Sequence, residues 1–144
     1  MKILLDTNVL LWALASPDRL QPGVRHDLEN AENTILFSAA SIWEIAIKSG
    51  LGRPDFAYEP IEILKAAEAS NFEEILITSR IAARVKGMTL NHSDPFDRLI
   101  LAQAEAAESW LYTSDKKLWD VSPIVKPIGR AGRSDPSLPG SPAE

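Results

Sequence analysis

Short apolar runs alternate with helical segments along most of this chain, and that alternation limits the fold more than any other feature. The runs expected to form strands are residues 2–5, 34–37, 74–77, 110–113 and 124–128. Apolar runs of this length are typical of buried strands. Because a helical segment separates each run from the next, the sequence predicts an α/β fold with a mainly parallel sheet covered on both faces.

The segments between the strands carry signals for helix starts and helix ends. Pro60 and Pro95 can each occupy a first helical turn, where a missing backbone N–H costs little. Gly50 and Gly87 follow helical stretches and are expected to end them. The predicted helices cover residues 9–14, a segment after Pro22, and residues 38–49, 60–70, 79–86, 94–107 and 115–119.

The size and composition suit a single domain followed by a tail. A chain of 144 residues is short for two independent cores. From Gly129 onward, nine of sixteen residues are Gly, Pro or Ser, and Leu138 is the only large aliphatic residue. We therefore expect a folded domain over residues 1–128 and a disordered tail over 129–144.

Missing residue types restrict the possible chemistry. The chain has no cysteine, which excludes disulfides, thiolate nucleophiles, iron–sulfur clusters and cysteine zinc sites. Its two histidines, His26 and His92, are too few for a histidine-rich metal site. Any bound metal would need mainly oxygen ligands, so the chemistry must rest on carboxylates, hydroxyls or the backbone.

The N-terminal segment resembles a signal peptide only superficially. Residues 9–15 are apolar, but the run is short for an exported protein, and Asp6 and Asn8 interrupt the segment before it. No later apolar run is long enough to cross a bilayer. We expect a cytoplasmic protein that does not contact a membrane.

Four acids follow predicted strands or lie near the start of the helices after them. Asp6 follows the first strand, Glu44 lies in the helix after the second, Asp97 lies in the first turn of its helix, and Asp115 follows the fourth strand. Ligands of open α/β sheets bind outside the carboxyl ends of the strands. The four carboxylates are therefore expected to meet at one edge of the sheet.

Each acid also has a purely structural interpretation. Asp6 and Asp115 can cap the helices that begin after them, and Ser41 with Glu44 matches a capping box. Asp97 gains from the dipole of the helix that it begins. Taken singly, the acids are better explained by these roles than by a shared site.

Partial burial favours a shared site. Asp97 lies on the apolar stripe of its helix, and Glu44 lies in a largely apolar helix. Partly buried acids need compensating partners. Lys48 and Arg98 are too few to neutralise four acids, whereas a divalent cation could do so.

A cluster of this kind suits Mg²⁺ or Mn²⁺. Both ions prefer hard oxygen ligands, and Mg²⁺ usually binds one or two carboxylates together with water and phosphate oxygens. Such a site fits phosphoryl transfer, because the cation activates bound water and stabilises the departing oxygen. It also explains how a chain of net charge −5 could bind nucleic acid, since the metal reverses the local field.

Motifs in four segments carry a family resemblance. The segments are Leu4–Trp12, Ser41–Lys48, Asp94–Ala104 and Thr113–Asp115. Their order and spacing resemble PIN-domain ribonucleases of the VapC toxin type over residues 1–128. The resemblance implies a PIN-like three-layer α/β/α sandwich with a central, mainly parallel sheet. It also implies a Mg²⁺- or Mn²⁺-dependent endoribonuclease that acts on RNA as the toxin of a toxin–antitoxin pair, binds a cognate antitoxin and forms a homodimer.

The resemblance also assigns roles to individual residues. Carried over by position, the catalytic acids are Asp6, Glu44, Asp97 and Asp115. Asp6 and Asp97 would bind the metal directly, and the other two would complete the cluster. Thr7 and Ser114 would contribute hydroxyls. Asn8 departs from the pattern, because similar chains often carry histidine there.

Two other functions stay open at this stage. A phosphoacceptor receiver domain also combines a small α/β fold with an acidic Mg²⁺ pocket, but it needs an aspartate after a central strand, and the run 74–77 ends without one. A catalytically silent interaction module, whose acids only cap helices, is the second alternative.

The remaining candidates carry weaker signals. His92 is expected to hydrogen-bond within a loop rather than act as a general base. Asp94 is expected to cap its helix, and Arg130 and Arg133 are assigned no function. Most of the tryptophans are expected in the core, these being Trp12, Trp43, Trp110 and Trp119. Candidate phosphate contacts, most of them expected to be solvated surface, are Arg19, Arg25, Lys48, Arg53, Arg84, Lys86, Arg98, Lys116 and Lys117.

Overall fold

The computed structural model describes residues 1–88 and 94–131, and its centre is a five-stranded sheet. The strands are β1 Lys2–Leu5, β2 Thr34–Ser38, β3 Glu73–Ile75, β4 Trp110–Thr113 and β5 Val125–Pro127. Their order is β3-β2-β1-β4-β5, and every neighbouring pair is parallel. The chain therefore starts in the middle of the sheet and reaches both edges later.

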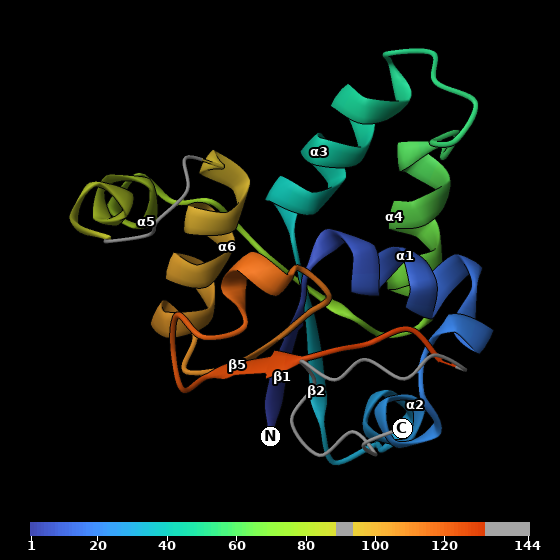
Figure 1. Cartoon of the computed structure of the whole chain (residues 1–144), viewed down its shortest axis with the longest axis horizontal. Coiled ribbons are helices and arrows are strands. Elements are labelled where there is room, and N and C mark those ends of the chain that lie inside the picture. The colour runs from blue at the N-terminus through green and yellow to red at the C-terminus, as the bar shows by residue number, and fades with distance from the viewer. Residues whose placement is uncertain (89–93, 132–144) are drawn as a thin grey trace.

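Helices cover both faces of this sheet, as Figure 1 shows. They are α1 Thr7–Ala15, α2 Pro22–Glu29, α3 Ala39–Ser49, α4 Pro60–Ala69, α5 Ser79–Arg84 and α6 Pro95–Ala106. Three short 3₁₀ turns span Pro17–Arg19, Val85–Gly87 and Lys116–Leu118. The predicted α/β/α sandwich, with α1 to α4 on one face and α5 and α6 on the other, is confirmed.

Two hydrophobic cores lie on the two faces of the sheet. Successive side chains of a strand point to opposite faces. Ile3 and Leu5 accordingly join the core under α1 to α4, while Leu4 joins the core under α6. All three are fully buried. This burial on both sides explains the uninterrupted apolar run of β1 and fixes the place where the strand ends, at Asp6.

Most predicted elements are confirmed, with boundary differences at the edges of the sheet. The run 74–77 forms strand β3 only over Glu73–Ile75, and Leu76 and Ile77 are exposed. The reason is that β3 pairs only with β2, which ends at Ser38 opposite Ile75. Beyond that pair the backbone has no ladder partner, so the strand stops.

The prediction that most tryptophans are core residues is wrong for two of the four. Trp119 is buried and Trp12 partly buried, but Trp43 is 58% exposed and Trp110 is 43% exposed. The buried residues of α3 are Ala40, Ser41 and Ile45, so Trp43 lies off the stripe that faces the sheet. Trp110 is the first residue of β4, where the cover of the sheet ends.

Some predictions lie outside the described residues. These include the loop role of His92 and the tail from residue 132 onward, which contains Arg133. The domain boundary at residue 128 stays a prediction. Within residues 1–88 and 94–131, no helix is long and apolar enough to span a membrane.

Candidate active site

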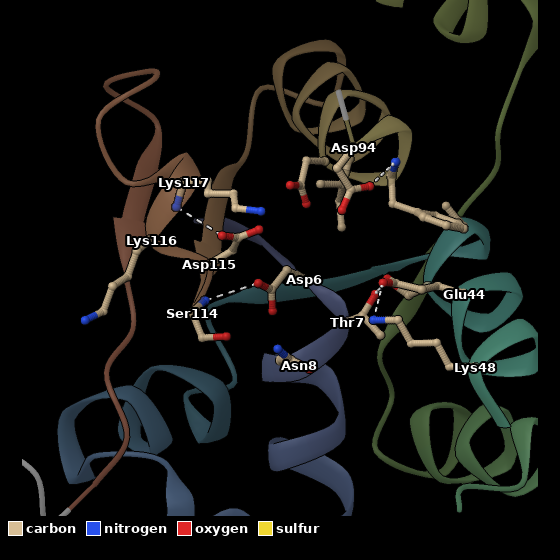
Figure 2. Close-up of a pocket in the computed structure, with 15 residues that line it drawn as sticks. Asp6, Thr7, Asn8, Glu44, Lys48, Asp94, Ser114, Asp115, Lys116 and Lys117 are labelled. Carbon is tan, nitrogen blue, oxygen red and sulfur yellow. Dashed lines mark hydrogen bonds and ion pairs between the residues drawn. The ribbon is translucent and has the colours of Figure 1, made fainter. Parts of the chain in front are cut away.

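The carboxyl edge of the sheet carries a pocket of about 420 Å³ that all four predicted acids line. Asp6 follows β1 and Asp115 follows the neighbouring strand β4. Glu44 comes from α3, the helix after β2, and Asp97 from the first turn of α6. The topology brings together side chains more than a hundred residues apart, as the sheet-edge rule predicts (Figure 2).

The buried carboxylate of Asp6 accepts several hydrogen bonds from the protein. Its Oδ1 accepts a hydrogen bond from Val9 N at 2.8 Å, so it caps α1 as one interpretation predicted. Its Oδ2 accepts from the Thr113 hydroxyl and, at 3.1 Å, from Ser114 N. Burial raises the pKa of Asp6 to about 6, although these hydrogen bonds oppose the rise and the charge of Glu44 adds to it. Capping and lining the pocket are thus compatible roles for one side chain.

Glu44 reaches the pocket from the middle of α3. Its Oε1 accepts a hydrogen bond from the Thr7 hydroxyl at 2.5 Å, and its Oε2 lies 2.8 Å from Lys48 Nζ. Its side chain is largely buried. The capping-box interpretation of Ser41 and Glu44 is wrong, because α3 begins at Ala39 and its N-cap is Ser38. Glu44 is therefore free of any capping role and is directed toward the other acids (Figure 2).

Asp97 has the most perturbed carboxyl in the pocket. Burial raises its pKa to about 8, with further contributions from a hydrogen bond to Asp115 and from the charges of Asp115, Asp94 and Glu44. Asp94 caps α6 as predicted, accepting from Phe96 N at 2.9 Å. Burial and the neighbouring acids thus make the charged form of Asp97 costly, and a bound cation would offset that cost.

The hydroxyl of Thr113, which was not predicted as a site residue, links two of the acids. Thr113, fully buried at the end of β4, donates to Asp6 and accepts from Asp115 N at 3.0 Å. Asp115 itself caps the turn after it through Lys117 N at 3.0 Å. Ser114 contacts Asp6 through its backbone N–H. Thr113 belongs to the motif Thr113–Asp115, but no sequence signal distinguishes its hydroxyl from that of Ser114.

Fewer basic residues line the pocket than the nine named as candidate phosphate contacts. Three of the nine candidate phosphate contacts line the pocket, namely Lys48, Lys116 and Lys117. Three others instead pair with acids elsewhere, namely Arg25, Arg53 and Arg84. Lys48 is paired with Glu44, while Lys116 and Lys117 are exposed. The pocket wall therefore carries five carboxylates, counting Asp94, and three lysines.

The donor set fits a divalent cation in its chemistry. Over residues 1–88 and 94–131, no group of three or more His, Cys, Asp or Glu side chains already stands in an arrangement that would hold a metal ion. The carboxylates around Asp6 and Asp97 nevertheless offer the oxygen ligands that Mg²⁺ and Mn²⁺ prefer. Both carboxyls have raised pKa values, so a cation bound to either would relieve an existing electrostatic cost.

Comparison with known proteins identifies the family. The chain belongs to the PIN domain family, which matches residues 3–122. A comparison with curated proteins gave no match. The sequence resemblance to PIN domains is therefore confirmed over most of the domain.

Solved structures show the same fold. The crystal structure of VapBC2 from Rickettsia felis, bound to a DNA fragment from their promoter, contains a chain similar to this one at 19% identity and a TM-score of 0.58. The match covers 89% of this chain and 99% of that chain. A toxin–antitoxin complex from Klebsiella pneumoniae matches at 23% identity and a TM-score of 0.57, over 85% and 94% of the two chains. At these identities the likeness shows the fold alone.

Proposed function

We propose that this chain is a Mg²⁺- or Mn²⁺-dependent endoribonuclease of the VapC type. The observation that carries the proposal is the pocket in which Asp6, Glu44, Asp97 and Asp115 converge from four separate segments. PIN domains are generally nucleases, which supports the assignment. The substrate is RNA, and cleavage proceeds by attack of an activated water on phosphorus.

The chain's own residues supply the frame for this chemistry. Asp6 and Asp97 would hold the cation, which when bound activates water and stabilises charge on the phosphate and departing oxygen. Thr113 and the Ser114 amide orient Asp6 through their hydrogen bonds. Lys48 and Thr7 fix the position of Glu44. Asp97, whose pKa is raised, would need to be ionised to hold the cation, so protons and the cation would compete for it.

Lysines at the pocket edge complete the site. Lys116 and Lys117 are exposed at the turn after β4 and would contact the phosphate backbone of the substrate. Such contacts give affinity without base selection. They do not define which RNA is cleaved.

Cleavage assays with acid substitutions test the proposal. The wild-type chain should cleave RNA with Mn²⁺ or Mg²⁺ and lose this activity in EDTA. Asp6→Asn and Asp97→Asn should abolish cleavage while circular dichroism shows an intact fold. Asp27→Asn removes a carboxylate of α2 that does not line the pocket and is the matched control, expected to remain active. Full activity in both pocket variants would defeat the assignment.

We also propose that the chain is the toxin of a toxin–antitoxin pair, neutralised by a cognate antitoxin, and that it forms a cytoplasmic homodimer. One of the structurally similar chains comes from VapBC2 of Rickettsia felis and another from a toxin–antitoxin complex of Klebsiella pneumoniae, which supports a protein partner. Growth arrest on induction, relieved by co-expression of the antitoxin gene, is the expected result. Arrest that persists in Asp97→Asn would separate toxicity from the pocket.

A silent interaction module is the second candidate, because three acids of the pocket wall do cap helices or turns. These are Asp6, Asp94 and Asp115. Isothermal titration with Mn²⁺ separates the two functions. The nuclease proposal expects one-site or two-site binding that Asp97→Asn weakens, whereas the silent module expects none.

The receiver-domain alternative needs a correction. The run 74–77, expected to be a central strand, forms β3 at the edge of the sheet. The central strand is β1, and it is followed directly by an aspartate, Asp6. Strand position therefore does not count against a receiver domain. Membership of the PIN domain family does, and it favours the nuclease.

A further inference from the structure

An aromatic pair extends the acidic pocket toward solvent. Phe96 of α6 lines the pocket, and its ring centroid lies 5.3 Å from that of Trp43 on α3, with the ring planes tilted by 57°. Trp43 is 58% exposed, so most of its indole faces solvent. The pair thus joins the two acid-bearing helices at the mouth of the pocket.

Each ring is adjacent in sequence to a pocket acid. Trp43 directly precedes Glu44, and Phe96 directly precedes Asp97. The Phe96 backbone N–H is held by the Asp94 carboxylate at 2.9 Å. The aromatic pair is therefore carried by the same two helices, next in sequence to two of the acids that would meet a scissile phosphate.

The opposite wall of the pocket has a different chemistry. In Figure 2, Lys117 and Asp115 lie across the pocket from Glu44 and Lys48. An RNA strand bound in the pocket would therefore have lysines beside one part of its backbone. An exposed aromatic surface would lie beside another part of the strand. Lysines beside the backbone and aromatic side chains beside the bases are both features of proteins that bind single-stranded nucleic acid.

We infer that Trp43 and Phe96 form a stacking subsite for one unpaired base of the RNA next to the cleaved phosphate. The inference rests on the proposed function and adds the structural form of the substrate. Every base has a π-face, so an aromatic surface binds bases with little sequence preference. In a duplex both faces of a base are covered by its neighbours, so this subsite selects unpaired RNA over double-stranded RNA.

The other possible occupant of Trp43 is a protein. Ile47 is exposed farther along α3 and Leu51 is exposed just after that helix ends, and a partner covering this face would also cover Trp43. The pairing of Trp43 with a ring that lines the pocket favours the base, because Phe96 places the aromatic surface at the site of the proposed chemistry. The two occupants predict different results in the experiment below.

The experiment measures binding of short fluorescent RNAs to the full chain by anisotropy, with Ca²⁺ replacing Mg²⁺ once the RNA is shown to stay intact. Trp43→Leu should weaken binding of single-stranded RNA about tenfold, and Trp43→Phe should restore most of the loss. Trp110→Leu is the matched control. It removes another exposed tryptophan, at the amino end of β4 and so at the opposite end of the strands from the pocket. It should leave affinity unchanged.

A double-mutant cycle identifies the contact as stacking. An abasic residue is moved along the RNA one position at a time, and at one position next to the cleaved phosphate the effect of Trp43→Leu should disappear. An equal loss with intact and abasic RNA at every position would overturn the inference. So would a loss of affinity in Trp43→Leu that tracks a change of oligomeric state in light scattering, because Trp43 would then be a protein contact.

The outcomes also separate this inference from the proposed function. Cleavage of RNA by the wild-type chain with no coupling between Trp43 and any base defeats the stacking subsite alone. A wild-type chain that neither binds nor cleaves RNA defeats the proposed function, and the subsite with it.

Discussion

Two polar clusters in this molecule differ in how the charge of their carboxylates is compensated. We call the group of Asp27, Tyr112 and Lys126 the Asp27 cluster. Asp27 of α2 accepts a hydrogen bond from the Tyr112 hydroxyl at 2.6 Å and lies 3.3 Å from Lys126 Nζ. Burial and the neighbouring Asp27 raise the pKa of Tyr112, so its hydroxyl keeps the proton that it donates. In the pocket at the carboxyl edge of the sheet, five carboxylates face three lysines, and the carboxyls of Asp6 and Asp97 have raised pKa values.

The difference shows which acids the fold satisfies by itself. Asp27 has a cation and a hydroxyl supplied by the chain, so its charge is compensated without any ligand. The pocket acids repel one another and are partly desolvated, which is costly unless a proton or a cation joins them. We expect the Asp27 cluster to contribute stability and the pocket to contribute cation binding.

The largest effect should come from exchanging a pocket acid for its neutral amide. Asp97→Asn should reduce RNA cleavage by at least about 100-fold, because it removes a proposed metal ligand. In the absence of metal the same change should stabilise the fold by about 1 kcal/mol or more at pH 8, since it removes a repelled charge. Cleavage kinetics and urea unfolding in EDTA measure the two effects.

Asp27→Asn should give the opposite pattern and is the internal control. It removes a compensated charge, so unfolding should become easier while cleavage per folded molecule stays unchanged. If Asp97→Asn destabilised the metal-free chain as much as Asp27→Asn does, the contrast between the two clusters would be wrong.

An intermediate effect is expected from the buried hydroxyl that joins two pocket acids. Thr113→Val keeps the side-chain shape but removes the donor to Asp6 and the acceptor for Asp115 N. Loss of such a supporting contact should weaken Mn²⁺ binding by about 10- to 100-fold. Isothermal titration checks this, and Thr113→Ser should recover most of the affinity. Equal weakening in Thr113→Ser would point to packing rather than the hydroxyl.

A smaller, pH-dependent effect should appear in the stability of the metal-free chain. The pKa values of Asp6 and Asp97 rise on folding from 3.8 to about 6 and about 8. Between these values the folded chain binds more protons than the unfolded chain, so stability must fall as pH rises from about 4 to about 8. Thermal unfolding in EDTA should show this fall in wild type.

The metal response should vary with pH in the complementary direction. Protons and cations compete for the same carboxylates, so the rise in Tm caused by Mn²⁺ should be larger at pH 8 than at pH 5. Asp97→Asn should flatten both trends. A wild-type Tm that is independent of pH over this range in EDTA would contradict the raised pKa values.

The position of the pocket acids could be predicted from sequence, because strand ends and helix starts are local features. The apolar run ending at Asp6 and the Asp94–Pro95 signal locate their elements, and parallel strands then bring the acids to one edge. Helix periodicity also indicated that Asp97 would be partly buried, which is confirmed.

What sequence could not supply depends on contacts between distant segments. The hydrogen bond from Thr113 to Asp6 spans 107 positions, and one hydroxyl in a motif looks like any other until the strands are placed side by side. The exposure of Trp43 follows from which face of α3 meets the sheet, and a largely apolar helix does not reveal that face. The compensation of Asp27 by Tyr112 and Lys126 needed the register of β4 and β5.

The smallest effect should come from the tyrosine that compensates Asp27. Tyr112→Phe removes the hydroxyl donor and leaves the ring, which is almost fully buried, in place. Lys126 still pairs with Asp27 in this variant, and water can replace part of the lost hydrogen bond. The free energy of unfolding should therefore fall by about 1 kcal/mol, less than the full value of a hydrogen bond to a charged group. Urea denaturation measures this loss, and RNA cleavage should not change. A tenfold drop in cleavage from Tyr112→Phe would show that the two clusters are coupled through β4, whose Tyr112 carbonyl accepts from Asp6 N at 3.0 Å, and the division between a structural and a functional cluster would then fail.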